Sequence, residues 1–268
     1  MIDQTQILHC LTYVFTGTVT GLAAGLFGIG GGLLVVPALL YLFEHMHTIP
    51  APMMMQFAAG TSLAIMIFTA ASAVYAHMKK GNILWHTFQR LWPGIVIGTL
   101  VGAYCSHLLP TLFLKKILGI MLLVALVNMI YHLKATPLAR TINRFVDYGV
   151  GLSIGLLSGL IGIGGGVLII PYLSYCGIDL RKISAVSIAC TLLVALIGTG
   201  SFMLTGFGES GLPAYTTGYI YWPAVLWITI PSILMAPIGA RLTYTLPLQQ
   251  LKYAFSLLLL LIAIKLLI

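Results

Sequence analysis

Charged side chains are scarce in this sequence. Asp, Glu, Lys and Arg make up 7% of the 268 residues, whereas a soluble domain carries about a quarter. Hydrophobic residues account for 60% of the chain. This balance excludes an ordinary soluble globular domain, which needs a charged surface to face water. We therefore expect lipid to surround most of the chain.

The residue patterns of common metal, redox and catalytic sites are also missing. The cysteines, Cys10, Cys105, Cys176 and Cys190, have no C-x-x-C spacing, and no H-E-x-x-H occurs. No acidic residue lies in the middle of an apolar segment, and no paired carboxylates or Ser-His arrangement occurs there. We therefore expect no cofactor, no metal site and no enzymatic activity.

The formal charge of +8 does not point to nucleic acid. The Lys and Arg residues form no basic stripe with interleaved aromatics but lie between apolar segments, where they act as topology signals. Apolar runs of about 18 to 25 residues are long enough to cross ~30 Å of hydrocarbon as helices. Such runs include residues 83–109, 114–133, 183–204 and 251–268. The sequence predicts an all-α, polytopic integral membrane protein.

An internal repeat organises the chain. Residues 21–37 (GLAAGLFGIGGGLLVVP) and 155–171 (GLLSGLIGIGGGVLIIP) are identical at eleven of seventeen positions, at a fixed offset of 134. Trp92-Pro93 matches Trp222-Pro223 further along. We interpret residues 1–133 as a first transmembrane repeat, 134–147 as a charged cytoplasmic linker and 148–268 as a second repeat.

The loop charges predict that the two repeats are inverted. If the chain reverses at residues 28–32 and 162–166, each repeat has five segments, a Gly-tipped hairpin plus three transmembrane helices. An odd number of segments turns the second repeat over in the membrane. Most Lys and Arg residues then fall on one face, with Glu44 and Glu209 on the other. By the positive-inside rule we expect an inner (plasma) membrane protein with both termini outside.

The glycine-rich tips predict an anion site. Segments 33–43 and 167–176 are too short to cross the membrane, so the tips should lie inside it. Irregular backbone at that depth must be shielded or line a watery cavity. Each tip precedes a helix, and two helix amino termini near the midplane would favour a small anion without a buried Lys or Arg.

Hydroxyl donors are expected near such a site, because removing an anion from water is costly. The candidates are Thr61 and Ser62 in the first repeat and Ser184, Ser187 and Thr191 in the equivalent region of the second, with Ser62 and Ser187 preferred. The alternative is that these hydroxyls bond to a carbonyl one turn back in their own helix. Other glycines have small-x-x-x-small spacing, as in Gly98-x-x-x-Gly102 and Gly155-x-x-x-Gly159, and we interpret those as helix packing.

The paired G-x-x-G-x-G-G-G motifs, each followed by a proline, resemble those of the sulfite exporter TauE/SafE family of membrane permeases. Ala59-Gly60-Thr61-Ser62 and the two-repeat layout add to the resemblance, which covers essentially the whole chain. It implies transport of sulfur oxyanions or organosulfur compounds such as sulfite and sulfoacetate. It also implies that the tip glycines frame the path: Gly28, Gly30, Gly31, Gly32, Gly162, Gly164, Gly165 and Gly166.

One departure from the family pattern concerns the second repeat. The family often repeats G-T-S there, but this chain has Ala185-Val186-Ser187, so only Ser187 is retained.

The leading hypothesis is a carrier for a small sulfur oxyanion or organosulfonate, with membrane lipids as its surroundings and no nucleic-acid partner. An anion channel is the second hypothesis, since the same tips could serve one. A membrane-embedded enzyme is the third, and the missing catalytic patterns argue against it. The sequence leaves the solute, the direction of transport and the oligomeric state open.

Overall fold

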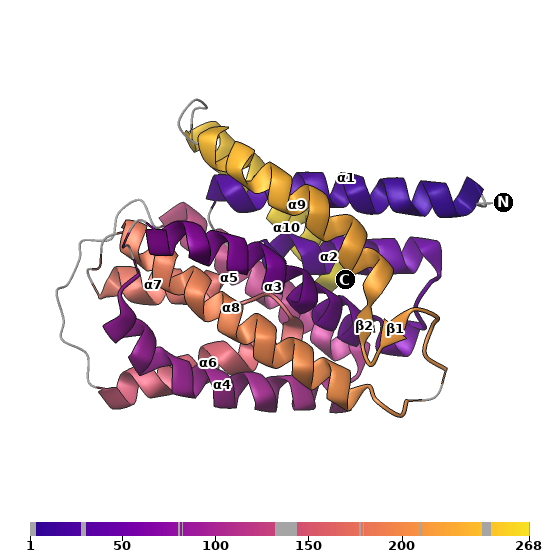
Figure 1. The fold of residues 1–268 in the computed structure, drawn as a ribbon, viewed down its shortest axis with the longest axis horizontal. Coiled ribbons are helices and arrows are strands. Elements are labelled where there is room, and N and C mark those ends of the chain that lie inside the picture. Colours follow the sequence, from indigo (N-terminus) through magenta and orange to yellow (C-terminus); the bar gives the residue numbers. More distant parts are fainter. Residues whose placement is uncertain are drawn as a thin grey trace.

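The computed structural model describes residues 4–27, 31–79, 81, 83–131, 144–176, 178, 180–209, 211–242 and 248–267. Over this part of the chain the protein is a bundle of helices with one short β-hairpin (Figure 1). The first half holds α1 (Gln4–Phe27), α2 (Gly32–Met46), a 3₁₀ turn (Ala51–Met53), α3 (Met54–Lys79), α4 (Trp85–Leu108) and α5 (Thr111–Tyr131). The second half holds α6 (Arg144–Ile161), α7 (Gly166–Tyr175), α8 (Leu180–Thr205), β1 (Thr216–Thr217), β2 (Ile220–Tyr221), α9 (Trp222–Leu242) and α10 (Leu248–Leu267).

Several helices are long and apolar enough to span a bilayer. In the described residues these are Ala51–Lys79, Trp85–Leu108, Arg144–Ile161, Lys182–Thr205 and Trp222–Gly239. Lipid offers no hydrogen-bond partners to the backbone, whereas a helix pairs its own N–H and C=O groups. A helix is therefore the expected form of a spanning segment. The predicted all-α, polytopic membrane fold is confirmed.

Two helices in the bundle are too short to span. Helix α2 has 15 residues and α7 has 10, about 22 Å and 15 Å of helix against a hydrocarbon core of ~30 Å. Figure 1 shows α2 turning back alongside α1. Helix α2 extends beyond the predicted range 33–43 at both ends, by one residue at its start and by Glu44, His45 and Met46 at its end. It continues through Pro37, as α7 does through Pro171. The lost N–H bond at each proline does not end the helix.

The helices of the two repeats pack in an exchanged pattern. Helix α1 packs along α9, and its counterpart α6 packs along α4, the counterpart of α9. The equivalent helices α3 and α8 pack on each other, and so do α5 and α10. The two halves of the chain are therefore interleaved rather than placed side by side as separate domains.

The direction of α3 relative to α8 follows from glycine contacts. A Cβ on Gly60 of α3 would lie 3.1 Å from Cβ of Phe202, and one on Gly198 would lie 2.7 Å from Cδ1 of Leu63. Early residues of α3 thus meet late residues of α8, so these equivalent helices run in opposite directions. An inverted repeat requires this arrangement, although the inversion across a membrane stays a prediction.

Glycines set the distance between α4 and α6. A Cβ on Gly98 would lie 2.2 Å from the Leu152 carbonyl oxygen, and one on Gly155 would lie 2.4 Å from that of Ile95. Gly94, Gly102, Gly151 and Gly159 make equivalent close approaches. The small-x-x-x-small spacing of these helices therefore serves helix packing, since backbones this close leave no room for a side chain.

The predicted linker, 134–147, lies mostly outside the described residues, which resume at residue 144. Helix α6 begins there, so the last four residues assigned to the linker are helical. The division into two repeats and a linker stays a prediction.

We expect Gly98→Ala to lower the free energy of unfolding by about 1–3 kcal/mol, because the new methyl group would force α4 and α6 apart. Thermal unfolding of the purified protein in detergent measures this. Gly149→Ala is the matched control, since a Cβ at this α6 position meets nothing within 4 Å. Equal stability of the two variants would contradict glycine-limited packing.

Candidate functional site

The tips of the two hairpins lie against each other inside the bundle. A Cβ on Gly32, the first residue of α2, would lie 2.3 Å from the carbonyl oxygen of Ile163 in the second glycine-rich segment. Ile163 is buried, as are the glycines on either side of it, Gly162 and Gly164. The two motifs that lie 134 residues apart in sequence thus form one buried junction, which we call the tip junction. We define it as Gly31, Gly32 and residues 162–166.

Both short helices begin at this junction without a side-chain cap. Gly31 and Gly165 are the N-cap residues, and neither helix start receives a side-chain hydrogen bond. The Gly31 carbonyl accepts hydrogen bonds from Leu34 and Val35 N–H, and the Gly165 carbonyl makes the equivalent pair. The first N–H groups of a helix have no partner within the helix, so each start carries a partial positive charge.

Glycine is required at several positions of the junction. Gly31, Gly162 and Gly164 have φ angles of 74°, 74° and 78°, a region that other residues rarely adopt. A Cβ on Gly162 would also lie 2.4 Å from Cα of Ala59 in α3. Gly165 differs, since its φ of −68° is open to any residue. Gly28 and Gly30 lie outside the described residues.

Met66 of α3 and Thr191 of α8 border the junction. The Met66 sulfur would lie 2.6 Å from a Cβ on Gly32 and 3.0 Å from one on Gly164. The Thr191 methyl group would lie 3.0 Å from the same Cβ of Gly164. Met66 occupies the position in the first repeat that Thr191 occupies in the second, when Ser62 is aligned with Ser187. Sequence reasoning selected Thr191 but missed Met66, which that alignment could have found.

A small cavity lies beside Gly31, with a volume of about 30 Å³. It is lined by Thr20, Gly21, Ala24, Gly31, Val35, Ile65, Met66, Thr69, Ser232 and Ala236. The hydroxyls of Thr20 and Thr69 donate to carbonyls one turn back in their own helices, and Ser232 donates to the Gly17 carbonyl. The cavity has room for about one water molecule. The cavity is too small for a solute much larger than water.

The predicted hydroxyl residues have different surroundings. Thr61 is fully buried, and its Oγ1 accepts a hydrogen bond of 3.1 Å from the backbone N–H of Tyr221 in β2. The Ser62 hydroxyl is also buried, and it has no hydrogen-bond partner among the described residues. Ser187 is buried on α8. Thr61 therefore anchors the β-hairpin, whereas Ser62 keeps a hydroxyl available.

Two further hydroxyls were not selected from the sequence. Thr99 of α4 and Thr229 of α9 are equivalent when Trp92-Pro93 is aligned with Trp222-Pro223. Both are buried, and neither hydroxyl has a hydrogen-bond partner within the described ranges. Their shared place in the repeat was the signal that could have identified them.

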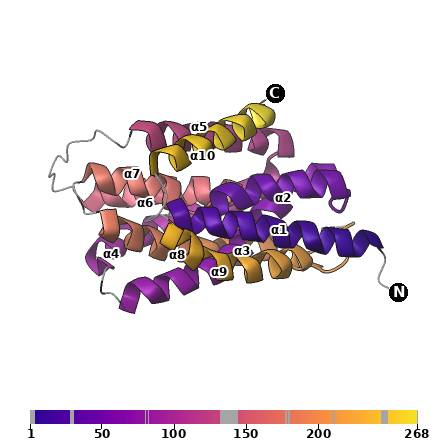
Figure 2. The same ribbon diagram turned by 90° about the horizontal axis from the view of Figure 1, so that it is seen from above.

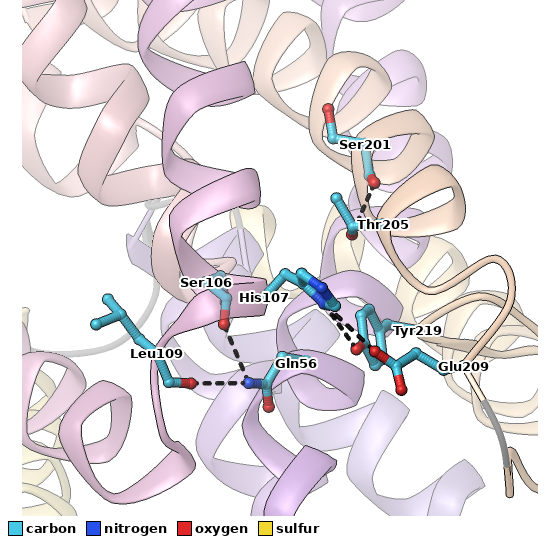
Figure 3. Close-up of polar contacts among 8 residues, drawn as sticks. All are labelled: Gln56, Ser106, His107, Leu109, Ser201, Thr205, Glu209 and Tyr219. Carbon is cyan, nitrogen blue, oxygen red and sulfur yellow. Dashed lines mark hydrogen bonds and ion pairs between the residues drawn. The ribbon is translucent and has the colours of Figure 1, made fainter.

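Polar contacts hold the connection between α8 and α9 against the end of α4 (Figure 3). His107 Nδ1 lies 3.0 Å from the Tyr219 hydroxyl and 3.9 Å from a Glu209 carboxylate oxygen. The Tyr219 ring contacts Phe57 and Phe202 edge-on. This connection covers the end of α3 that carries Thr61, so it separates that part of the core from the outside.

The Tyr219 hydroxyl stays protonated in this setting. Burial raises the pKa of Tyr219 to about 12, and the nearby Glu209 carboxylate adds to the shift. The side chain is therefore a neutral hydrogen-bonding group across the physiological pH range. Nearby, the Gln56 side-chain amide donates to the carbonyls of Ser106 and Leu109, which ties α3 to the end of α4 (Figure 3).

We expect Thr61→Val to lower the free energy of unfolding by about 1–3 kcal/mol, because the Tyr221 N–H would lose its acceptor. Ser62→Ala is the neighbouring comparison, and it should leave stability unchanged or slightly higher because its hydroxyl has no partner. Thermal unfolding in detergent checks both variants. A larger loss for Ser62→Ala than for Thr61→Val would refute this assignment of roles.

Comparisons with known proteins agree with these features. The family model for the sulfite exporter TauE/SafE matches residues 13–266. A probable membrane transporter protein of Haemophilus influenzae is 35% identical, over 97% of this chain and 98% of that protein. One from Methanocaldococcus jannaschii is 32% identical, over 91% of this chain and 90% of its own length. No solved structure matches the chain. The family and these relatives are named as exporters and transporters rather than enzymes.

Proposed function

Because the chain belongs to the sulfite exporter TauE/SafE family, we propose that this membrane transporter carries a small sulfur oxyanion or organosulfonate through the tip junction. The observation that carries the proposal is the pair of uncapped helix starts at Gly32 and Gly166, brought together by the contact of Gly32 with Ile163. Sulfite is the substrate class in the family's name.

The electrostatics of the junction suit an anion. Each helix start is equivalent to about half a positive charge, and the bound anion would accept hydrogen bonds from its free N–H groups. The described residues that line the neighbouring cavity include no acidic side chain that would repel an anion. The unpaired hydroxyl of Ser62 and the hydroxyls of Ser187 and Thr191 are the side-chain donors we assign to the solute once the tips separate.

The exchanged packing of the helices favours alternating access. The antiparallel pair α3 and α8 gives the bundle two similar halves that face opposite ways, as inverted repeats require. In the part of the tips that the structure describes, Gly32 lies against the backbone carbonyl of Ile163. Such a contact could open toward either end when the halves move against each other.

The distribution of charge supports an orientation of the protein in an inner membrane. Lys79, Arg90, Arg144 and Lys182 lie at the end of the bundle where α3 finishes and α4, α6 and α8 begin. At the opposite end lie Glu44, near the end of α2, and Glu209, shortly after the end of α8. By the positive-inside rule we propose that the first end is cytoplasmic, an orientation in which both termini would lie outside.

The test is uptake into liposomes that carry the purified protein. We expect saturable uptake of one of four radiolabelled anions, which are sulfite, thiosulfate, sulfate and a simple sulfonate, measured with and without a pH gradient. If none moves while the liposomes remain intact and loaded, the substrate class is wrong. Unitary currents in electrical recordings would instead favour an anion channel, which the same tips could form.

A variant tests the place of transport. Gly32→Ala puts a methyl group 2.3 Å from the Ile163 carbonyl oxygen, so the tips must shift. We expect the uptake rate to fall tenfold or more, which corresponds to a rise of about 1.4 kcal/mol in the free-energy barrier to transport. Gly200→Ala on α8 is the control, because a Cβ there meets nothing within 4 Å. Full activity of Gly32→Ala at equal expression would exclude the tip junction from the path.

A further inference from the structure

A groove of about 390 Å³ lies at the edge of the bundle between α1, α2 and α10. Figure 2 shows α10 lying along α5, with α2 and then α1 as the next helices across the bundle. The groove is separate from the tip junction, although its inner end reaches Thr20, which also lines the cavity beside Gly31. Its walls are apolar and include Phe15, Val19, Leu34, Pro37, Leu258 and Ile262.

Charged side chains gather at one end of this groove. Glu44 at the end of α2, Lys115 near the start of α5 and Lys265 near the end of α10 all line it. The Lys265 ammonium lies 4.9 Å from the centre of the Tyr41 ring, a cation–π contact that holds the ammonium at this end. The groove is therefore amphipathic along its length, charged at one end and apolar along the rest.

The length of the groove matches one leaflet of a bilayer. On α2 it extends from Leu34 to Glu44, ten residues apart, or about 15 Å of helix. This is half of the ~30 Å hydrocarbon thickness. The charged end coincides with the ends of the helices, where lipid headgroups lie, and the apolar end lies near the hairpin tip. These are the dimensions and polarity of one phospholipid chain below its headgroup.

We propose that this groove is a binding site for a phospholipid with a primary ammonium in its headgroup, of the phosphatidylethanolamine class. The phosphate would accept hydrogen bonds from Lys115 and Lys265, and the ammonium would donate to Glu44. One acyl chain lies along α2 between α1 and α10. An anionic headgroup without an ammonium would leave Glu44 without a cationic partner, and a trimethylated ammonium cannot donate a hydrogen bond to it.

The pseudo-equivalent surface of the second repeat is not a comparable groove. The space between α5, α6 and α7, beside Leu168 and Gly164, measures only about 10 Å³. Leu168 is the counterpart of Leu34 at the offset of 134. The groove is thus asymmetric, since α1 and α2 of the first repeat and α10 of the second wall it and the space beside Leu168 is far smaller. A bound lipid would support the exposed side of the α1–α2 hairpin.

The test is lipid retention measured by native mass spectrometry, a readout that does not depend on transport. The purified protein is exchanged into an equal mixture of phosphatidylethanolamine, phosphatidylglycerol and phosphatidylcholine lipids with identical chains. We expect retention of one phosphatidylethanolamine at least tenfold above the other two. The double variant Lys115→Gln with Lys265→Gln should lose this retention at least tenfold, whereas Lys116→Gln, which does not line the groove, should keep it.

Two further variants separate the headgroup from the chain. Glu44→Gln should remove the preference for ethanolamine while a lipid stays bound. Ala38→Trp should fill the groove and displace all three lipids, with Ala71→Trp on the exposed part of α3 as the control. Equal retention of the three lipids by every variant would overturn the proposal. So would a dimer that Ala38→Trp dissociates without any change in bound lipid, because a second copy would then be the occupant.

Discussion

The fold depends on one constraint, which is that irregular backbone inside a membrane must be enclosed by protein. An unpaired peptide group in lipid costs several kcal/mol, and the tip junction brings two such segments together among buried residues. The structure meets this constraint by packing backbone against backbone. Gly32 lies against Ile163 and Gly162 lies against Ala59, at separations that exclude any side chain. The glycines between α4 and α6 extend the same principle outward, because they let the surrounding helices close tightly around the tips.

The pseudosymmetry of the packing does not extend to the chemistry of the junction. Helices α2 and α7 start with equivalent backbone hydrogen bonds, but Gly31 has a positive φ and Gly165 does not. The first repeat presents Met66 where the second presents Thr191. Thr61, whose counterpart is Val186, is committed to the β-hairpin. A solute that passes between the two tips would therefore meet two different half-sites, one with a soft sulfur and one with a hydroxyl.

The features that the sequence predicted correctly are those that leave a local pattern, such as a long apolar run or a repeated motif. Apolar length predicted the spanning helices α4 and α8, and the glycine motifs predicted short helices after two turns. The end of α2 was placed too early, at residue 43, because the apolar run stops there, whereas the helix continues through Glu44 and His45 to Met46. Contacts between distant segments were out of reach, since no local pattern encodes the bond from Tyr221 to Thr61 or the meeting of His107 with Tyr219. The groove between α1, α2 and α10 was equally unpredictable, because it forms only when helices far apart in the sequence pack together.

In the proposed anion site, helix starts take the place of a buried cation, which would have a physical consequence for transport. A lysine or arginine in the middle of the bilayer carries a large desolvation cost and, once paired with an anion, would hold it strongly. A helix start contributes about 0.3–1 kcal/mol, up to ~2 kcal/mol where it is partly buried. In the proposed site, two such starts would attract an anion without trapping it there. Because these N–H groups belong to the tips, the separation of the tips that admits the solute would also move its donors, so binding and opening would be coupled through the same backbone.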